Sequence, residues 1–132
     1  MRLSFTILVC LLLFALRLQA QAPAIQWQKT FGGNHGEYAH AAEATADGGY
    51  IISGSTEGPD NAGIMGYHGP AGTGDFLVIK IDAAGKQEWQ KCLGGFNLET
   101  NAFIHQTADG GYIVAGSTAS TDCSVKTPQL QP

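Results

Sequence analysis

Hydrophobic positions along the chain fall into short runs separated by glycine-rich turns. Residues 75–82, DFLVIKID, carry apolar side chains on both alternating faces, which predicts a strand buried between neighbours. Residues 50–53, YIIS, form a second β-branched and aromatic run that Gly54 ends. Runs of this length with turn residues between them predict an all-β fold.

The turn residues indicate how these strands connect. Asp47-Gly48-Gly49 predicts a tight hairpin, because glycine adopts positive φ without a Cβ clash. Residues 39–46 would be the partner strand before this turn, although their Ala and Glu residues fit a helix equally well. We also expect strands at 25–31 and at 87–93, the second following the turn Ala83-Ala84-Gly85-Lys86.

The chain repeats itself with an offset of 62 residues. WQKTFGG at 27–33 returns as WQKCLGG at 89–95, and TADGGYIISGST at 45–56 returns as TADGGYIVAGST at 107–118. Sixteen of 32 positions are identical between 27–58 and 89–120 without a gap. We expect the recurring residues to be structural; they include Trp27, Gly32, Gly33, Asp47, Gly48, Gly49, Tyr50, Trp89, Gly94, Gly95, Asp109, Gly110, Gly111 and Tyr112.

A fixed period with about four strands predicts tandem units that bury their cores against one another. Turns too short for a helical crossover predict antiparallel pairing. We therefore expect an incomplete β-propeller-like array, with a β-sandwich or a β-solenoid as the alternatives. The first unit would cover residues 25–88, including an irregular Gly/Pro-rich loop at 57–74, and a partial second unit would cover residues 89–132.

The N-terminal region predicts export. Arg2 precedes an apolar run at 5–16, and Ala20 offers a cleavage point, so residues 1–20 have the layout of a signal-peptide helix rather than a membrane span. We expect a periplasmic, outer cell-surface or extracellular location. Without residues 1–20 the chain has five basic and eleven acidic side chains, and this net negative charge argues against nucleic-acid and anionic-membrane partners.

The pattern W-Q-K-x-x-G-G, then T-x-D-G-G-Y-I-x-x-G-S-T, then D-F-L-V-I-K-I-D resembles the tandem repeats of secreted Bacteroidota proteins. The resemblance covers residue 25 to about 125. It implies propeller-like repeats in many copies, often followed by a C-terminal sorting domain for type IX secretion. Since one unit and part of a second are present, we expect the chain to be an N-terminal piece of a longer protein.

Candidate chemistry is sparse. Asp60, Asn61 and Asp75 could supply some of the oxygens of a calcium site, although the residues of a known calcium-loop signature are missing and turn-forming acids explain them as well. The histidines lack zinc spacing, and we expect no catalytic residues and no cofactor. An oxidising compartment would permit a bridge between Cys92 and Cys123, with two free thiols as the alternative.

These patterns predict a secreted, non-catalytic repeat protein with a structural or ligand-binding role. Its partners would be further repeats of the same chain, or a protein or glycan ligand. The recurring Trp and Tyr side chains could stack on a sugar, but packing between units explains their recurrence better. Two alternatives stay open: the repeat region of a larger secreted hydrolase or adhesin, and a truncated product without a function of its own.

Overall fold

The protein is all-β, as predicted. The computed structural model describes residues 22–58 and 63–121, and these form six strands and no helix. All four strand pairings are antiparallel, which confirms the expected connectivity. The strands are β1 (Glu37–Ala44), β2 (Tyr50–Thr56), β3 (Asp75–Ile81), β4 (Gln87–Leu93), β5 (Glu99–Gln106) and β6 (Tyr112–Thr118).

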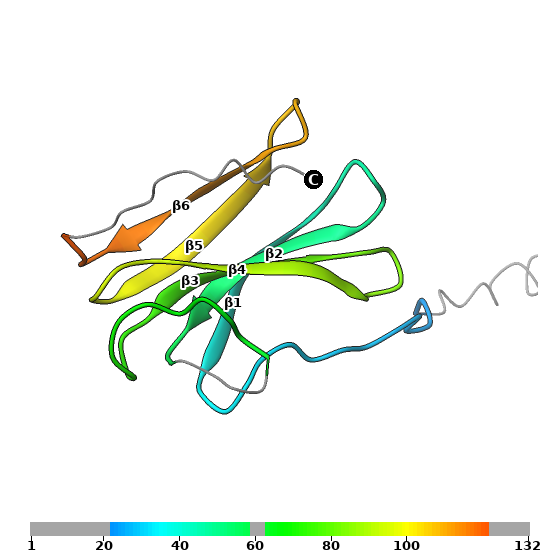
Figure 1. The fold of residues 1–132 in the computed structure, drawn as a ribbon. Coiled ribbons are helices and arrows are strands. Elements are labelled where there is room, and N and C mark those ends of the chain that lie inside the picture. Colours follow the sequence, from blue (N-terminus) through cyan, green and yellow to red (C-terminus); the bar gives the residue numbers. More distant parts are fainter. Residues whose placement is uncertain (1–21, 59–62, 122–132) are drawn as a thin grey trace, which may run out of the picture.

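The first four strands form one sheet in chain order, β1-β2-β3-β4 (Figure 1). The ambiguous segment at 39–46 is a strand, because β1 pairs along β2. The run at 75–82 contains β3, an inner strand flanked by β2 and β4, and six of the seven β3 residues are buried apolar or charged side chains. The apolar pattern of this run therefore predicted its place correctly.

Two details differ from the expectation. Residues 25–31 form no strand, and β4, which was expected to begin the second copy, is the last strand of the first sheet. Both copies carry the WQK motif, but β4 has β3 beside it, whereas no described strand pairs with residues 25–31. An extended segment becomes a strand only when a neighbour takes up its backbone hydrogen bonds. The sheet is therefore out of phase with the sequence repeat.

The hairpin turns β1–β2 and β5–β6 are built identically. The Asp47 carboxylate accepts hydrogen bonds from Thr45 Oγ1 and the Gly49 amide, and Gly48 has a φ of +85°. Asp109 accepts the same bonds from the residues 62 positions later, at Thr107 and Gly111. The predicted role of the Asp-Gly-Gly motif as a hairpin turn is confirmed.

The two-stranded sheet β5–β6 packs face to face on the first sheet, with β5 lying across β1, β2 and β3. The contact buries Ile51, Val78 and Ile104 together. Ser53 Oγ donates a hydrogen bond of 2.7 Å to the Ala102 carbonyl within this contact. Stacked sheets of adjacent repeats therefore share one apolar layer, which is the burial that tandem units require.

The opposite face of the first sheet has its own core. It buries Ile64, Leu77, Ile79, Ile81 and Cys92, with Phe31 and Ile52 packed against them. Cys92 is a buried free thiol whose pKa burial raises to about 12, so it carries almost no thiolate at neutral pH. The other half of the considered bridge, Cys123, lies outside the described residues.

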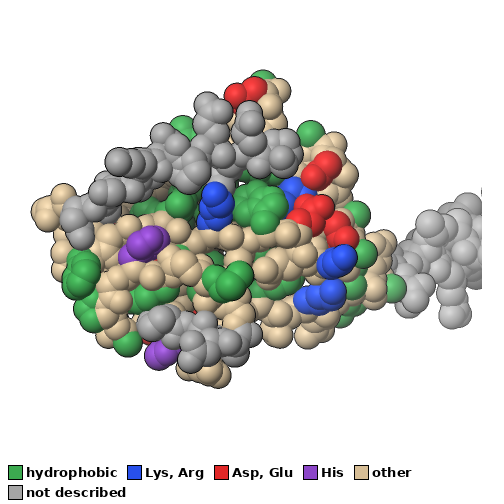
Figure 2. Space-filling model, in the orientation of Figure 1, with side chains coloured by type: hydrophobic (Ala, Val, Ile, Leu, Met, Phe, Trp, Pro, Cys, Tyr) green, Lys and Arg blue, Asp and Glu red, His purple; other side chains and the backbone are tan. Residues whose placement is uncertain are grey.

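Several expectations fall on undescribed parts of the chain. The signal-peptide segment 1–20 lies outside the described residues, as do Asp60 and Asn61 in the loop 57–74. In the part of that loop that is described, the structure has only an isolated bridge between Ala71 and Thr73. A search of the described part of the chain found no helix with the length and apolar character of a membrane span. Figure 2 shows acidic and basic side chains gathered toward the end that carries the hairpin turns.

Candidate functional site

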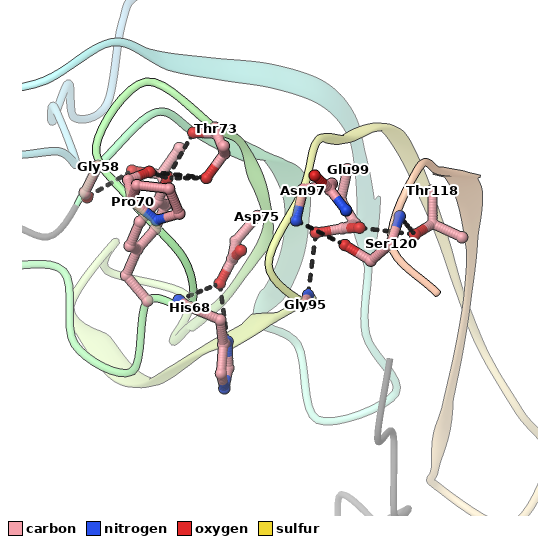
Figure 3. Close-up of polar contacts among 12 residues, drawn as sticks. Gly58, His68, Pro70, Thr73, Asp75, Gly95, Asn97, Glu99, Thr118 and Ser120 are labelled. Atoms are coloured by element: carbon pink, nitrogen blue, oxygen red, sulfur yellow. Dashed lines mark hydrogen bonds and ion pairs between the residues drawn. The ribbon is translucent and has the colours of Figure 1, made fainter. Parts of the chain in front are cut away.

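The most unusual chemistry lies where the Gly-Gly corner of the second copy meets the first sheet (Figure 3). Glu99, the first residue of β5, is almost completely buried there. Its Oε2 accepts the Gly95 amide hydrogen at 3.1 Å, and its Oε1 accepts the Thr118 hydroxyl at 2.6 Å. The glutamate thus ties the Gly-Gly corner to the end of β6.

The first copy has the same arrangement. Glu37 Oε2 accepts the Gly33 amide at 3.0 Å, and Glu37 Oε1 accepts the Thr56 hydroxyl at 3.2 Å. The recurring Glu belongs to the repeat, but its role as a clasp required the structure, because the sequence places Gly33 and Thr56 on opposite sides of it. The repeated identity at positions 37 and 99 was the signal that could have revealed it.

Hydrogen bonding decides the charge state of Glu99. Burial alone would raise the pKa of this carboxyl, but the bonds from Ser120, Thr118 and the Gly95 amide outweigh burial and lower it below its usual value. Glu99 is therefore a carboxylate at neutral pH, buried at the contact between the two sheets.

Asp75 is a second carboxyl at this corner, and its side chain is fully buried at the start of β3. Its Oδ2 accepts the His68 amide hydrogen at 2.8 Å and lies 2.8 Å from His68 Nδ1. Its Oδ1 has no hydrogen-bond partner among the described residues. Burial raises the pKa of Asp75 despite the contacts with His68, and the negative charge of Glu99 raises it further.

Gly94 separates the two carboxyl groups. A Cβ atom at Gly94 would lie 2.5 Å from Asp75 Oδ1 and 2.6 Å from Glu99 Oε2, so both oxygens face the same point. In Figure 3 the Asp75 side chain lies between His68 and the segment that carries Gly95 and Glu99. Glycine is therefore required at position 94, because the two carboxyl groups leave no room for a side chain there.

The weak calcium hypothesis stays untested, because Asp60 and Asn61 lie outside the described residues. Of the three candidates, only Asp75 lies among the described residues, and its Oδ2 is occupied by His68. No group of three or more His, Cys, Asp or Glu side chains arranged for metal binding occurs in residues 22–58 and 63–121. Asp75 and Glu99 would offer two oxygens facing one point, whereas calcium takes six to eight.

A buried lysine forms a second polar cluster, at the hairpin-turn end. Lys80 on β3 is 3% exposed, and its Nζ lies 2.8 Å from both Asp47 Oδ2 and Glu88 Oε2. Burial would lower the pKa of Lys80, but the two carboxylates outweigh burial and raise it. The Lys80 ammonium, with the bonds from Thr45 and Gly49, holds the pKa of Asp47 far below its usual range. Local sequence patterns did not single out this lysine, although a charge inside an apolar run was the available signal.

The recurring aromatic residues form two matching pairs. Trp27 and Tyr50 meet edge to face with ring centroids 6.2 Å apart, and Trp89 and Tyr112 do so at 5.8 Å. Trp89 lies on the first sheet and Tyr112 on the second, so that pair joins the two sheets. Trp27 also donates from Nε1 to the Ala83 carbonyl at 3.1 Å. The pairs are packing contacts, as expected, although Trp27 and Tyr50 stay 37% and 39% exposed.

Comparison with known proteins identified no matching family model, no matching curated protein and no matching solved structure. The resemblance to secreted Bacteroidota repeats therefore stays a prediction from the residues, and the function has to be argued from the geometry.

Proposed function

We propose that this chain is a secreted or cell-surface repeat protein with a structural or ligand-binding role and no catalysis of its own. The supporting observation is that two kinds of packing contact each occur twice, at the same 62-residue offset. The clasps at Glu37 and Glu99, and the Trp27–Tyr50 and Trp89–Tyr112 pairs, all obey this offset.

The Trp27–Tyr50 pair is the most informative of these contacts. Residues 25–31 form no strand, yet Trp27 meets the first sheet as Trp89 of β4 meets the second sheet. The segment 25–31 thus occupies the place that the fourth strand of a preceding unit would take. Residues that recur because each unit stacks on the next favour an array of similar units. The resemblance to tandem repeats implies an array of this kind.

The polar clusters support a structural role for these residues. The clasp glutamates bond to backbone and threonine groups of their own unit, and Lys80 is enclosed by two carboxylates. The charges of Glu37, Glu99 and Lys80 thus hold strands and turns together. The partly exposed Trp27–Tyr50 pair is the surface where a glycan ring could stack, if the protein binds a ligand.

Export is tested by expressing the full chain in a bacterial host and following its location and mass. We expect a mature form that begins near residue 21 and leaves the cytoplasm, whereas Leu12→Arg, which interrupts the apolar run, should keep the chain inside and uncut. An uncleaved wild-type chain in the cytoplasm would contradict the secreted part of the proposal.

Ligand binding is tested by a glycan array with matched tryptophan variants. A glycan that stacks on the exposed pair should be lost with Trp27→Ala and kept with Phe96→Ala, an exposed aromatic outside both pairs. Binding that is indifferent to Trp27 would remove this surface as the ligand site and leave the structural role.

A further inference from the structure

Strand β6 repeats strand β2 but has fewer neighbours. YIISGST and YIVAGST agree at five of seven positions. Strand β2 pairs with β1 on one side and with β3 on the other, whereas β6 pairs only with β5 among the strands of residues 22–58 and 63–121. Two strands of closely similar sequence therefore differ in pairing: β2 has two strand neighbours, and β6 has one among the described residues.

Equivalent side chains also differ in exposure, because Ile51 is buried against Val78 of β3 and Ile104 of the stacked β5. Ile51 on β2 is 0% exposed, and its counterpart Ile113 on β6 is 59% exposed. Phe103, opposite Ala115 on the same face of the second sheet, is 60% exposed. An apolar face of this kind is typical of a surface that packs on another layer. The adjoining β6 edge, with no second strand partner among the described residues, is the part that can pair with another strand.

The turn beside β6 retains a place for a lysine. In the first unit, a Cβ at Gly49 would collide with the Ile81 carbonyl and lie 2.7 Å from Lys80 Nζ, so β3 requires glycine there. Gly111 is the counterpart of Gly49, but only atoms of its own turn, from Thr107 and Asp109, lie near its Cβ position. The second unit thus has the glycine without the strand that needs it.

The counterpart of Asp47 is also without its cation. Asp47 Oδ2 pairs with Lys80 at 2.8 Å. Asp109 accepts bonds from Thr107 and Gly111, and no ion pair involves it among the described residues. Its exposed carboxylate lies at the end of β6 where a lysine of a neighbouring strand would arrive.

We propose that the edge of β6 binds an antiparallel strand of the β3 type from a further unit of the same repeat. By the pairing of β2 with β3, the incoming Leu77-like residue lies opposite Gly116 and the Ile79-like residue opposite Val114. The incoming Lys80-like residue reaches Asp109 across Gly111. The inference rests on the proposed array of stacked units and names the surface and partner through which the array continues.

The experiment adds a synthetic peptide of residues 74–95, which carries the β3–β4 hairpin, to the purified full chain under reducing conditions. Calorimetry measures binding, and amide NMR shifts locate it. We expect shifts along Tyr112–Gly116, at least tenfold weaker binding to Gly111→Ala, and about fivefold weaker binding of a Lys80→Met peptide. Asp109→Asn should weaken binding as much as the Lys80→Met peptide does, because both changes remove the same ion pair. The asparagine amide oxygen still accepts the hydrogen bonds of the turn, so the turn itself should be kept.

Two controls make the outcome decisive. A peptide with Ile79→Pro should not bind, because proline cannot complete the ladder. The Glu57→Gln variant, which changes an exposed acid just after β2, should bind as wild type does. No binding, or equal binding to wild type and Gly111→Ala, overturns the inference. Energetic coupling between Trp89 and Tyr112 tests the stacking of units independently, so its persistence would leave the proposed function standing while the edge site fails.

Discussion

Replacing Gly94 with alanine should disrupt the contact between the two units. The new methyl group would lie 2.5 Å from Asp75 Oδ1 and 2.6 Å from Glu99 Oε2, far inside normal carbon–oxygen contact. Both side chains are buried, so neither can swing into solvent. Overpacking of this kind costs about 1–3 kcal/mol. A Glu99 that rotates away also loses hydrogen bonds of about 1 kcal/mol each.

We therefore expect Gly94→Ala to lower the free energy of unfolding by about 2–4 kcal/mol, a large share of the stability of a small domain. Urea unfolding followed by tryptophan fluorescence measures this, provided that the m-value is unchanged. Gly110→Ala is the matched control: its φ is +85° and its Cβ would meet nothing within 4 Å, so only the backbone cost of about 1–2 kcal/mol applies.

The contact itself is identified by a double substitution. Asp75→Ala removes one of the two oxygens that the methyl group meets, so Gly94→Ala should cost less in that background, whereas Gly110→Ala should cost the same. A Gly94→Ala variant within about 0.5 kcal/mol of wild type, or strict additivity with Asp75→Ala, would refute the reasoning.

Three further predictions concern the same contact. Glu99→Gln should lower the free energy of unfolding by about 1–2 kcal/mol at neutral pH, because it weakens the hydrogen bond from Thr118. The pKa of Glu99 is lowered in the folded protein, so this difference between variant and wild type should vanish as the pH falls from 4.5 through the native pKa. The pKa of Asp75 is raised, so wild type loses stability as the pH rises above 3.8, and Asp75→Asn should gain on it over that window in urea titrations. A double-mutant cycle of Trp89→Leu and Tyr112→Leu should give a coupling of about 0.5–1.5 kcal/mol, and a value near zero would contradict stacking through this pair.

Local sequence was sufficient for the buried strand β3 and for the two Asp-Gly-Gly turns. The alternation and β-branching at 75–82 predicted β3, and the Asp-Gly-Gly motif predicted both hairpins, because these depend on residues a few positions apart. Trp27 and Tyr50 recur at 89 and 112, and in both copies the two rings meet edge to face.

The candidate site could not be predicted in the same way. Asp75 was considered only as one of three weak calcium candidates, and local spacing did not reveal its contacts with His68, seven residues away, and with the corner that carries Glu99. Glu99 and Lys80 were not selected at all, since burial and partners decide their charge states. Such contacts join residues that no local spacing relates.

The amino-acid sequence alone established an all-β chain with a 62-residue period, because side-chain periodicity and turn glycines act locally. Only the tertiary structure decided which strands share a sheet, and whether a recurring motif is paired and buried in each copy. WQK is a strand at 89–91 and not at 27–29, and Ile51 is buried where Ile113 is exposed. The physical reason is that strand pairing and burial are properties of neighbours: a segment obtains them only where another strand lies beside it or across its face.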